Sequence, residues 1–240
     1  MIYLSGTFRR MKESLNQTQK KRNVRLWLAH DRVVTKILLF VALLLIFFLV
    51  GIVFLYGKNS FDQRVLDLIE PHITERRTKI MRFISFLGKH SFLIPIIGLL
   101  ITYFIIRKKK WLVIRTATVL LSSVLLMSFL KIVIQRQRPD NPLVEGITNF
   151  SFPSGHAFMA VAFYGLLIWL SAHNISKKWL QWGVNSSLVF LILLIGFSRI
   201  YLRVHYATDV IAGLSIGFVW LSFCLWIIDK KEPASAMHPL

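Results

Sequence analysis

Long apolar stretches separated by short polar segments dominate the chain after its first 36 residues. Six stretches carry no charged residue: Ile37–Gly57, Ser91–Ile106, Thr116–Leu130, Ala157–Ser176, Trp179–Ser198 and Val210–Ile228. About 20 apolar residues cross the hydrocarbon core of a bilayer, and four of the six stretches reach that length. The two shorter ones continue into Lys89-His90 and Trp111–Arg115, whose polar ends can extend toward the membrane surface. The pattern predicts six transmembrane helices.

A long polar segment, Lys58–His90, separates the first two stretches. Apolar residues recur in it at helical spacing on either side of Pro71: Phe61, Val65, Leu68 and Ile69 before it, and Ile80, Ile84 and Leu87 after it. Proline disfavours continuation of a helix, so this spacing predicts two helices. They could lie at the membrane interface or pack onto the bundle, and the sequence leaves both open. The predicted fold is therefore all-α, a six-transmembrane-helix bundle with a helical extracytoplasmic segment between its first two spans.

Composition agrees with a membrane protein. The chain is 55% hydrophobic, with a mean hydropathy of +0.59, yet has 30 Lys and Arg against 11 Asp and Glu. Such apolarity together with a net charge of +19 indicates charges confined to loops. The single cysteine, Cys224, lies in an apolar stretch, so the chain has neither a disulfide framework nor a cysteine metal site.

Three regions follow from this pattern. Residues 1–32 form a basic segment that we expect on the cytoplasmic side, residues 33–232 form the six-span domain, and residues 233–240 form a short tail. The basic segment adjoins the membrane, so anionic lipid headgroups explain its charge better than nucleic acid does. We therefore predict a lipid bilayer as a partner and no nucleic acid.

Lysine and arginine counts predict the orientation. Segments 1–36, 107–110, 177–178 and 230–231 hold 17 of these cations, and the loops on the opposite side hold 12. Cytoplasmic loops carry the excess of Lys and Arg. The prediction is a multi-pass protein of the cell membrane with both termini cytoplasmic, and the polar motifs described next would lie on the extracytoplasmic face.

The first motif follows the third stretch. Lys131 and Arg138 are seven residues apart, or two helical turns, which predicts side chains on one face at the end of that helix. Pro139 then marks a helix boundary. A lysine here could equally be a membrane-surface anchor. The motif therefore indicates an anion site only together with others.

The second motif, Pro153–His156, directly precedes the fourth stretch. Ser154 is a good N-cap, and Gly155 allows backbone N–H groups to approach a ligand closely. Free N–H groups at a helix N-terminus bind anions, and His156 would stand on the first turn beside such an anion. An ordinary capped helix with an interfacial histidine would look the same.

The third motif is the most specific. Ser198-Arg199 is followed by His205 and then by Asp209, four residues later. On a helix this spacing lets the carboxylate accept a hydrogen bond from the imidazole, fix its tautomer and stabilise the cation formed when the other nitrogen attacks. Arg199 offers a planar fork to phosphate oxygens. A purely structural His–Asp pair is the alternative.

Together the three motifs resemble the signature of the type 2 phosphatidic acid phosphatase and vanadium haloperoxidase superfamily, in its integral membrane lipid phosphatase branch. All eleven positions of that pattern are present in order: Lys131, Arg138, Pro139, Pro153, Ser154, Gly155, His156, Ser198, Arg199, His205 and Asp209. The resemblance implies hydrolysis of a lipid phosphate monoester or pyrophosphate through a phosphohistidine, with no metal or other cofactor. Phosphatidate, phosphatidylglycerol phosphate and undecaprenyl pyrophosphate are the candidate substrates.

The resemblance also implies roles for individual residues. His205 would attack phosphorus, Asp209 would orient it, and His156 would act as general acid. The phosphate would be bound by Lys131, Arg138, Ser154, Gly155 and Arg199. Arg136 and Arg203 lie outside the pattern, and we expect them to recruit anionic headgroups or to be solvated.

Three other functions fit parts of the pattern. His156, His205 and Asp209 could form a two-His, one-carboxylate iron site, although three converging cations favour an anion. A flippase or a non-catalytic phospholipid-binding protein needs a basic pocket but no His–Asp pair. Halide oxidation on bound vanadate belongs to the same superfamily, and a six-span membrane chain disfavours it.

Overall fold

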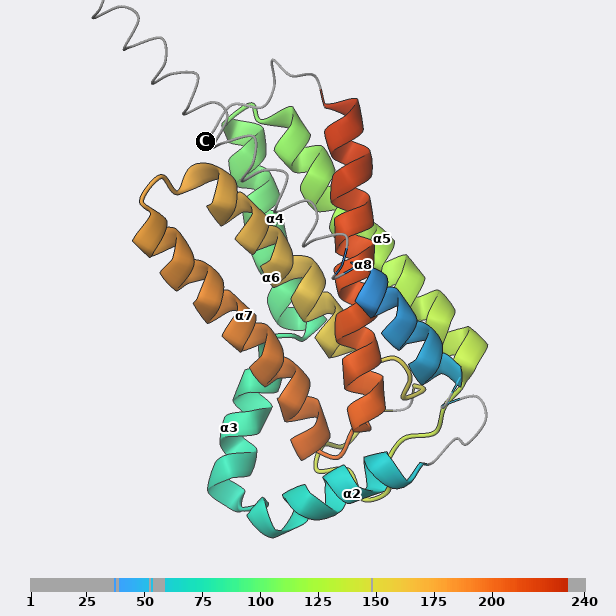
Figure 1. Cartoon of the computed structure of the whole chain (residues 1–240). Helices are drawn as coiled ribbons and strands as arrows, with labels where there is room; N and C mark the ends of the chain where they lie inside the picture. The colour runs from blue at the N-terminus through green and yellow to red at the C-terminus, as the bar shows by residue number, and fades with distance from the viewer. Residues whose placement is uncertain (1–36, 38, 52, 54–58, 148, 233–240) are drawn as a thin grey trace, which may run out of the picture. The chain divides into compact units, whose positions relative to one another are not determined.

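A computed structural model describes residues 37, 39–51, 53, 59–147 and 149–232, so the predicted basic segment 1–32 and tail 233–240 lie outside the described residues. The chain divides into two compact units, residues 1–41 and 42–240, and the second is described below. Its labelled elements are α2 (Ser60–Ile69), η1 (Glu70–His72), α3 (Glu75–Phe86), α4 (His90–Ile106), α5 (Lys110–Ile134), α6 (Gly155–Asn174), α7 (Lys178–Tyr201) and α8 (Ala207–Lys231). Within the described residues there is no strand, which confirms the all-α prediction (Figure 1).

Five helical stretches are long and apolar enough to cross a membrane. They are Glu75–Ile106, Lys110–Ile134, Gly155–Asn174, Lys178–Tyr201 and Ala207–Lys231. A shorter apolar helix, Leu39–Gly51, occupies the described part of the first predicted span. Helices are the expected solution because lipid offers no hydrogen-bond partner to the backbone, and an α-helix satisfies its own N–H and C=O groups. The chain is thus a multi-pass, all-helical membrane protein, and the sixth span stays a prediction.

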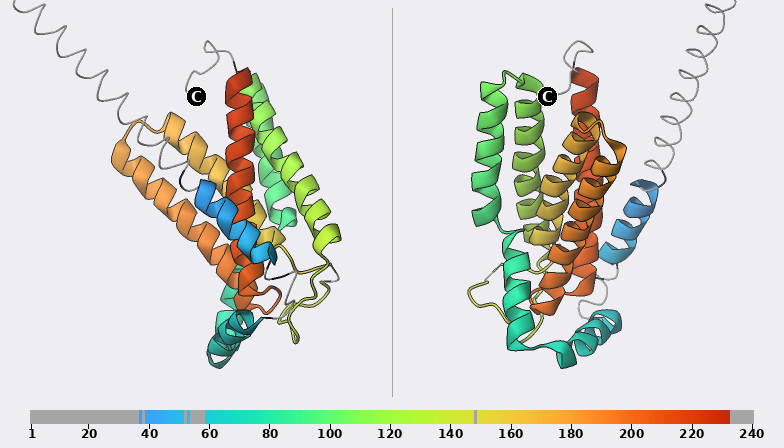
Figure 2. Two further views of the ribbon diagram at one scale, coloured as in Figure 1. Left: turned by 45° about the vertical axis from the view of Figure 1, so that its right-hand side comes forward. Right: turned by 90° about the vertical axis from the view of Figure 1, so that its left-hand side faces the viewer.

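Helix α6 is the centre of the bundle. Phe158, Ala160, Ala162 and Leu166 on this helix are fully buried, and its most extensive contacts are with α7 and α8 (Figure 2). Small residues allow such close packing in membrane proteins. At Gly213 of α8, a side-chain carbon would lie 2.6 Å from the backbone oxygen of Ser154. A glycine at this position therefore lets the start of α8 press against the start of α6.

The two helices predicted between the first two spans are present as α2 and α3, joined by the turn η1. Side chains of Asn59 and Thr74 cap them by accepting backbone N–H groups of Asp62 and Arg77. Part of the predicted apolar face of α2 packs inward, since Ile69 joins a cluster with Tyr201, Leu202 and Val204. However, Phe61 and Leu68 are 51% and 72% exposed, and the buried positions are Asp62, Leu66 and Ile69. The buried face thus contains a carboxylate.

Candidate active site

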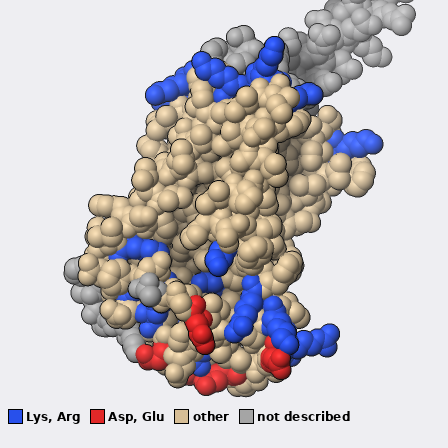
Figure 3. Space-filling view, turned by 180° about the vertical axis from the view of Figure 1, so that it is seen from behind, with Lys and Arg blue, Asp and Glu red and all other residues tan. Residues whose placement is uncertain are grey.

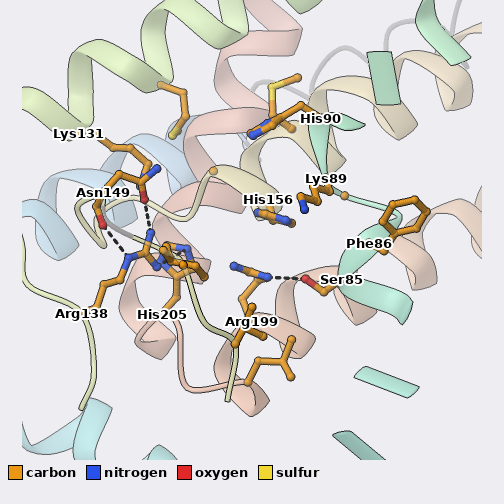
Figure 4. Close-up of a pocket in the computed structure, with 18 of the residues that line it drawn as sticks. Ser85, Phe86, Lys89, His90, Lys131, Arg138, Asn149, His156, Arg199 and His205 are labelled. Atoms are coloured by element: carbon orange, nitrogen blue, oxygen red, sulfur yellow. Dashed lines mark hydrogen bonds between the residues drawn. The ribbon is translucent and has the colours of Figure 1, made fainter. Parts of the chain in front are cut away.

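The three motifs meet at one pocket of about 590 Å³. Six of the eight predicted site residues line it: Lys131, Arg138, Gly155, His156, Arg199 and His205. They come from the end of α5, the loop that follows it, the start of α6, the end of α7 and the α7–α8 turn (Figure 4). Ser154 and Asp209 are fully buried and are not part of the lining. The sequence-distant motifs therefore form one site, with these two residues behind its wall.

The geometry predicted for Lys131 and Arg138 was wrong. Helix α5 ends at Ile134, where Gln135 adopts a left-handed conformation with φ of 48°, so Arg138 lies in a loop and not on a second helical turn. Its guanidinium donates through Nε to the Asn149 carbonyl at 2.7 Å and through Nη2 to Asn149 Oδ1 at 2.5 Å. The Lys131 ammonium donates to the carbonyl of Phe150. The loop after the helix thus brings Arg138 to the pocket beside Lys131, which stands in the last turn of α5.

His205 presents a defined nitrogen to the pocket. Arg138 Nη1 lies 3.3 Å from His205 Nε2. Arginine has no acceptor, so a hydrogen bond between them requires an unprotonated Nε2 and leaves the ring proton on Nδ1. Burial lowers the pKa of His205 to about 3, opposed by the Asp209 carboxylate and reinforced by Arg138. The geometry and the low pKa both favour a neutral imidazole whose Nε2 carries the lone pair, which here faces the Arg138 guanidinium.

Asp209 lies on the other side of the imidazole. Its Oδ2 is 3.7 Å from His205 Nδ1 and accepts the Ser151 hydroxyl at 2.5 Å and the Tyr206 backbone N–H at 2.9 Å. His205 precedes α8 and is not in a helix, so the predicted i, i+4 pair spans the helix start. The distance is longer than a hydrogen bond. Ser151 Oγ, 3.3 Å from His205 Nδ1, lies within reach of both groups.

The start of α6 carries the second motif as predicted, with Ser154 at the N-cap position and His156 in the first turn. The Ser154 hydroxyl does not cap the helix and makes no hydrogen bond within the described part of the chain. Its backbone N–H donates to the Asp209 carbonyl at 2.9 Å. Gly88, between α3 and α4, packs against His156, since a side-chain carbon there would meet the His156 ring at 3.5 Å.

Arg199 lies at the end of α7, 5% exposed, between the His205 and α3 sides of the pocket (Figure 4). Its Nη1 donates to the hydroxyl of Ser85 on α3. Its buried Nε makes no hydrogen bond within the described residues. A guanidinium with an unused donor beside a pocket is suited to an anionic oxygen.

Arg136 was placed wrongly from the sequence. It is buried, and it donates to Asp209 Oδ1 at 2.5 Å and to Asp62 Oδ2 at 2.7 Å. Asp62, Ser85, Asn149 and Ser151 were also missed. One signal in the sequence could have revealed the burial of Asp62. Leu66 and Ile69 follow it by four and seven residues, so on a helix the acid shares a face with these two apolar residues.

Basic groups dominate the pocket lining. Five Lys and Arg residues contribute to it, namely Arg82, Lys89, Lys131, Arg138 and Arg199, against one acid, Glu145. His90 lies near His156, with 6.4 Å between ring centroids. No group of three or more His, Cys, Asp or Glu in the described part is arranged to hold a metal ion. Moreover, both Asp209 oxygens already accept hydrogen bonds. The donor set suits a phosphate better than the iron site considered above.

Known proteins are similar to this chain in sequence and, where a solved structure exists, in fold. Residues 112–233 match the family model described as the PAP2 superfamily. The chain is 35% identical over 181 residues to phosphatidylglycerophosphatase B of Bacillus subtilis, covering 73% of this chain and 84% of that protein. An undecaprenyl-diphosphatase of Sulfolobus acidocaldarius is 28% identical, covering 82% and 95%. The crystal structure of a transmembrane PAP2-type phosphatidylglycerolphosphate phosphatase from Bacillus subtilis superposes with a TM-score of 0.74 at 27% identity, covering 82% of this chain and 98% of that one.

Proposed function

The chain belongs to the PAP2 superfamily, and from this premise we propose that it is an integral membrane lipid phosphatase. It removes phosphate from a lipid phosphate monoester or pyrophosphate. The observation that carries the proposal is the position of His205 Nε2, which lines a pocket surrounded by Lys131, Arg138 and Arg199. A neutral imidazole nitrogen among fixed cations is the arrangement that attack on a phosphate requires.

Chemistry begins at His205. Its Nε2 lone pair attacks phosphorus, the bond from phosphorus to the lipid oxygen breaks, and a phosphohistidine forms. His156 gives a proton to the departing oxygen. The imidazole gains positive charge as the new bond forms, and the Asp209 carboxylate, 3.7 Å from Nδ1, stabilises it.

The cations hold the phosphoryl group during both steps. Arg199 offers its buried Nε, while Lys131 and Arg138 exchange their contacts with loop carbonyls for phosphate oxygens. Gly155 completes the cradle at the start of α6, while Ser154, predicted to bind the phosphate as well, lies buried behind the pocket wall. Phosphoryl transfer depends mainly on such positioning and charge stabilisation. Water then attacks the phosphohistidine, His156 accepts the water proton, and His205 is regenerated as phosphate leaves.

Substrate choice follows from charge and lipid chemistry. Five Lys and Arg against one acid in the lining favour a headgroup with several negative charges. The names of the relatives point to a phosphatidylglycerophosphate in one case and an undecaprenyl diphosphate in another. Phosphatidate, phosphatidylglycerol phosphate and undecaprenyl pyrophosphate are therefore the substrates to test.

The pocket opens on the extracytoplasmic side in our proposal, with both termini cytoplasmic and six spans. On the face shown in Figure 3, Lys and Arg gather at one end of the molecule without acids, whereas the other end carries both signs. The orientation itself rests on the Lys and Arg counts, 17 in segments 1–36, 107–110, 177–178 and 230–231 against 12 on the opposite side. A reporter fused after Asn141 should be extracytoplasmic and one fused after Lys109 cytoplasmic, and the opposite pattern reverses the orientation.

Phosphate release by the purified protein in detergent with excess EDTA tests the function. The three candidate lipids are offered in parallel, with His205→Ala as the control. We expect release that resists EDTA and that the variant lacks. No release from any lipid by a folded preparation would favour a lipid-binding or flippase function, and release that EDTA removes would favour a metal enzyme.

A further inference from the structure

A buried charged cluster lies behind the pocket and links it to α2. Asp62, on the inner face of α2, is fully buried. Its Oδ1 accepts the Thr208 backbone N–H at 2.9 Å, and its Oδ2 accepts the Thr208 hydroxyl at 2.6 Å and Arg136 Nη2 at 2.7 Å. A buried carboxylate is costly unless it is paired and hydrogen-bonded, and Asp62 has both kinds of partner. It therefore fixes α2 to the start of α8.

Arg136 is the centre of this cluster. While Nη2 contacts Asp62, Nη1 donates to Asp209 Oδ1 at 2.5 Å and to the Thr208 hydroxyl at 2.7 Å. The Tyr206 ring lies 4.2 Å below the guanidinium carbon, and the Arg136 carbonyl accepts the Ser151 backbone N–H at 2.8 Å. The two nitrogens that reach the acids make arginine better suited than lysine to this position.

The contacts of Asp209 divide between its two oxygens. Oδ1 accepts the guanidinium, and Oδ2 accepts Ser151 and the Tyr206 N–H on the side of His205. With Oδ1 held by Arg136, the carboxylate has little freedom to turn its other oxygen away from the imidazole. Arg136 and Asp209 are 73 residues apart in sequence, so this restraint depends on the α5–α6 loop folding against α8.

We propose that Arg136 and Asp62 are positioning residues for the histidine chemistry, with Arg136 holding Asp209 toward His205 and Asp62 holding Arg136. The inference rests on the proposed function, because it assigns a role relative to the His205 nucleophile. It extends the active machinery to α2, an element outside the three motifs and outside residues 112–233.

Charge gives the cluster a second consequence. Asp62 and Asp209 share Arg136, so these three side chains sum to one negative charge, which matches the positive charge that His205 acquires during attack. Arg138, Arg199, Lys131 and His156 also face His205 from the other elements, and the bound phosphate balances them. Removing the Arg136 charge makes the surroundings of His205 more negative and raises the pKa of its imidazole.

The experiment compares Arg136→Gln, Arg136→Lys and Asp62→Asn with wild type. Steady-state kinetics use whichever of the three candidate lipids wild type hydrolyses fastest. For Arg136→Gln we expect kcat to fall about 10- to 100-fold with KM changed less than about threefold, as for outer partners of catalytic groups. In the pH profile of kcat/KM for Arg136→Gln, the fall in activity on the acid side should occur at higher pH than in wild type. Arg136→Lys keeps the charge and loses the fork, so kcat should fall while the acid limb stays in place.

Asp67→Asn is the matched control, because it removes the same charge from an exposed position on α2. It should leave kcat and the melting temperature unchanged, whereas Asp62→Asn should lower kcat.

A folded Arg136→Gln or Arg136→Lys protein with wild-type kcat overturns the proposal. A lower melting temperature with unchanged kcat per folded molecule and an unmoved acid limb also overturns it, in favour of a structural role. If Arg136→Gln or Asp62→Asn fails to fold, Arg136→Lys decides the outcome. Equal activity of wild type and His205→Ala would instead defeat the proposed function itself.

Discussion

Two buried arginines, one near each end of α5, have similar partners and different surroundings. Arg136 follows the end of the helix and pairs with Asp62 and Asp209, while Arg115 lies near its start and pairs with Asp229 and Glu232. Each also lies over an aromatic ring, Tyr206 at 4.2 Å for the first and Trp169 at 3.8 Å for the second. About 30 Å of helix separates them.

The difference between them is what their carboxylates touch next. Asp209 is 3.7 Å from an imidazole that lines the pocket, whereas Asp229 and Glu232 close the end of α8, outside the pocket lining. A buried ion pair is weak evidence for stability and none for function by itself. We infer that the neighbouring group decides whether such a pair serves the fold or the chemistry.

The largest effect is expected from removing the proposed nucleophile, His205, which lies beside the Arg136–Asp209 cluster. His205→Ala should lower kcat by about 10⁴-fold or more, because loss of a nucleophile leaves only binding and charge stabilisation. Phosphate release from the preferred lipid measures it, with the melting temperature as a check on folding. Turnover close to wild type in a folded variant would show that His205 is not the attacking group.

Neutralising Asp209 should have the next largest effect. Asp209→Asn keeps the shape and removes the charge beside Nδ1, so kcat should fall about 10²- to 10⁴-fold, as in other histidines deprived of their carboxylate. Single-turnover kinetics should show slower formation of the phosphoenzyme. If the variant loses stability but forms phosphoenzyme at the wild-type rate, Asp209 serves only the fold, as we expect for Asp229.

Removing Arg115 should lower stability and leave catalysis unchanged. Arg115→Met leaves the buried Glu232 carboxylate without its guanidinium, so the free energy of unfolding should drop by about 3 kcal/mol. We expect kcat per folded molecule to stay within about twofold of wild type. Denaturant unfolding and lipid hydrolysis measure the two quantities. A loss of kcat like that expected for Arg136→Gln would erase the distinction between the two clusters.

The smallest expected effect concerns pH. The folded pKa of His205, about 3, is below the ordinary value of 6.5, so between these values the unfolded chain binds a proton that the folded chain does not. Stability is therefore lost as pH falls below 6.5, by up to about 1.4 kcal/mol per pH unit from this residue. His205→Gln should lose less stability between pH 7 and pH 5, as measured by melting temperature. An equal loss in both proteins would mean that other groups cause it.

Local patterns were sufficient for much of the fold and the site. Helices occupy the last five apolar stretches and the two runs around Pro71, and the three motifs converge on one pocket. Apolar runs are reliable because the bilayer leaves the backbone few alternatives to helix. Motif spacing was a weaker guide, because it grouped the charges correctly but placed Arg138 on a helix that ends at Ile134.

Long-range packing decided what local patterns could not. Arg136 stands in a polar loop among Gln135 and Gln137, so its neighbours in sequence suggested a solvated cation, and its actual partner Asp62 is 74 residues away. In the same way, the positions of Thr208 and Arg136 determine which face of α2 is buried, because both bind Asp62 on that face. Burial of a charge depends on whether a distant opposite charge arrives, and no local pattern contains that information.

By itself the sequence determined the last five apolar helices, the two helices around Pro71 and the charged groups of the three motifs, because these depend on residues close together in the chain. Tertiary structure alone decided that His205 directs Nε2 toward Arg138 and Nδ1 toward Asp209, and that α2 contributes the carboxylate behind them. The physical reason is that the tautomer and charge of a buried ring depend on every group packed around it, and those groups come from five separate elements.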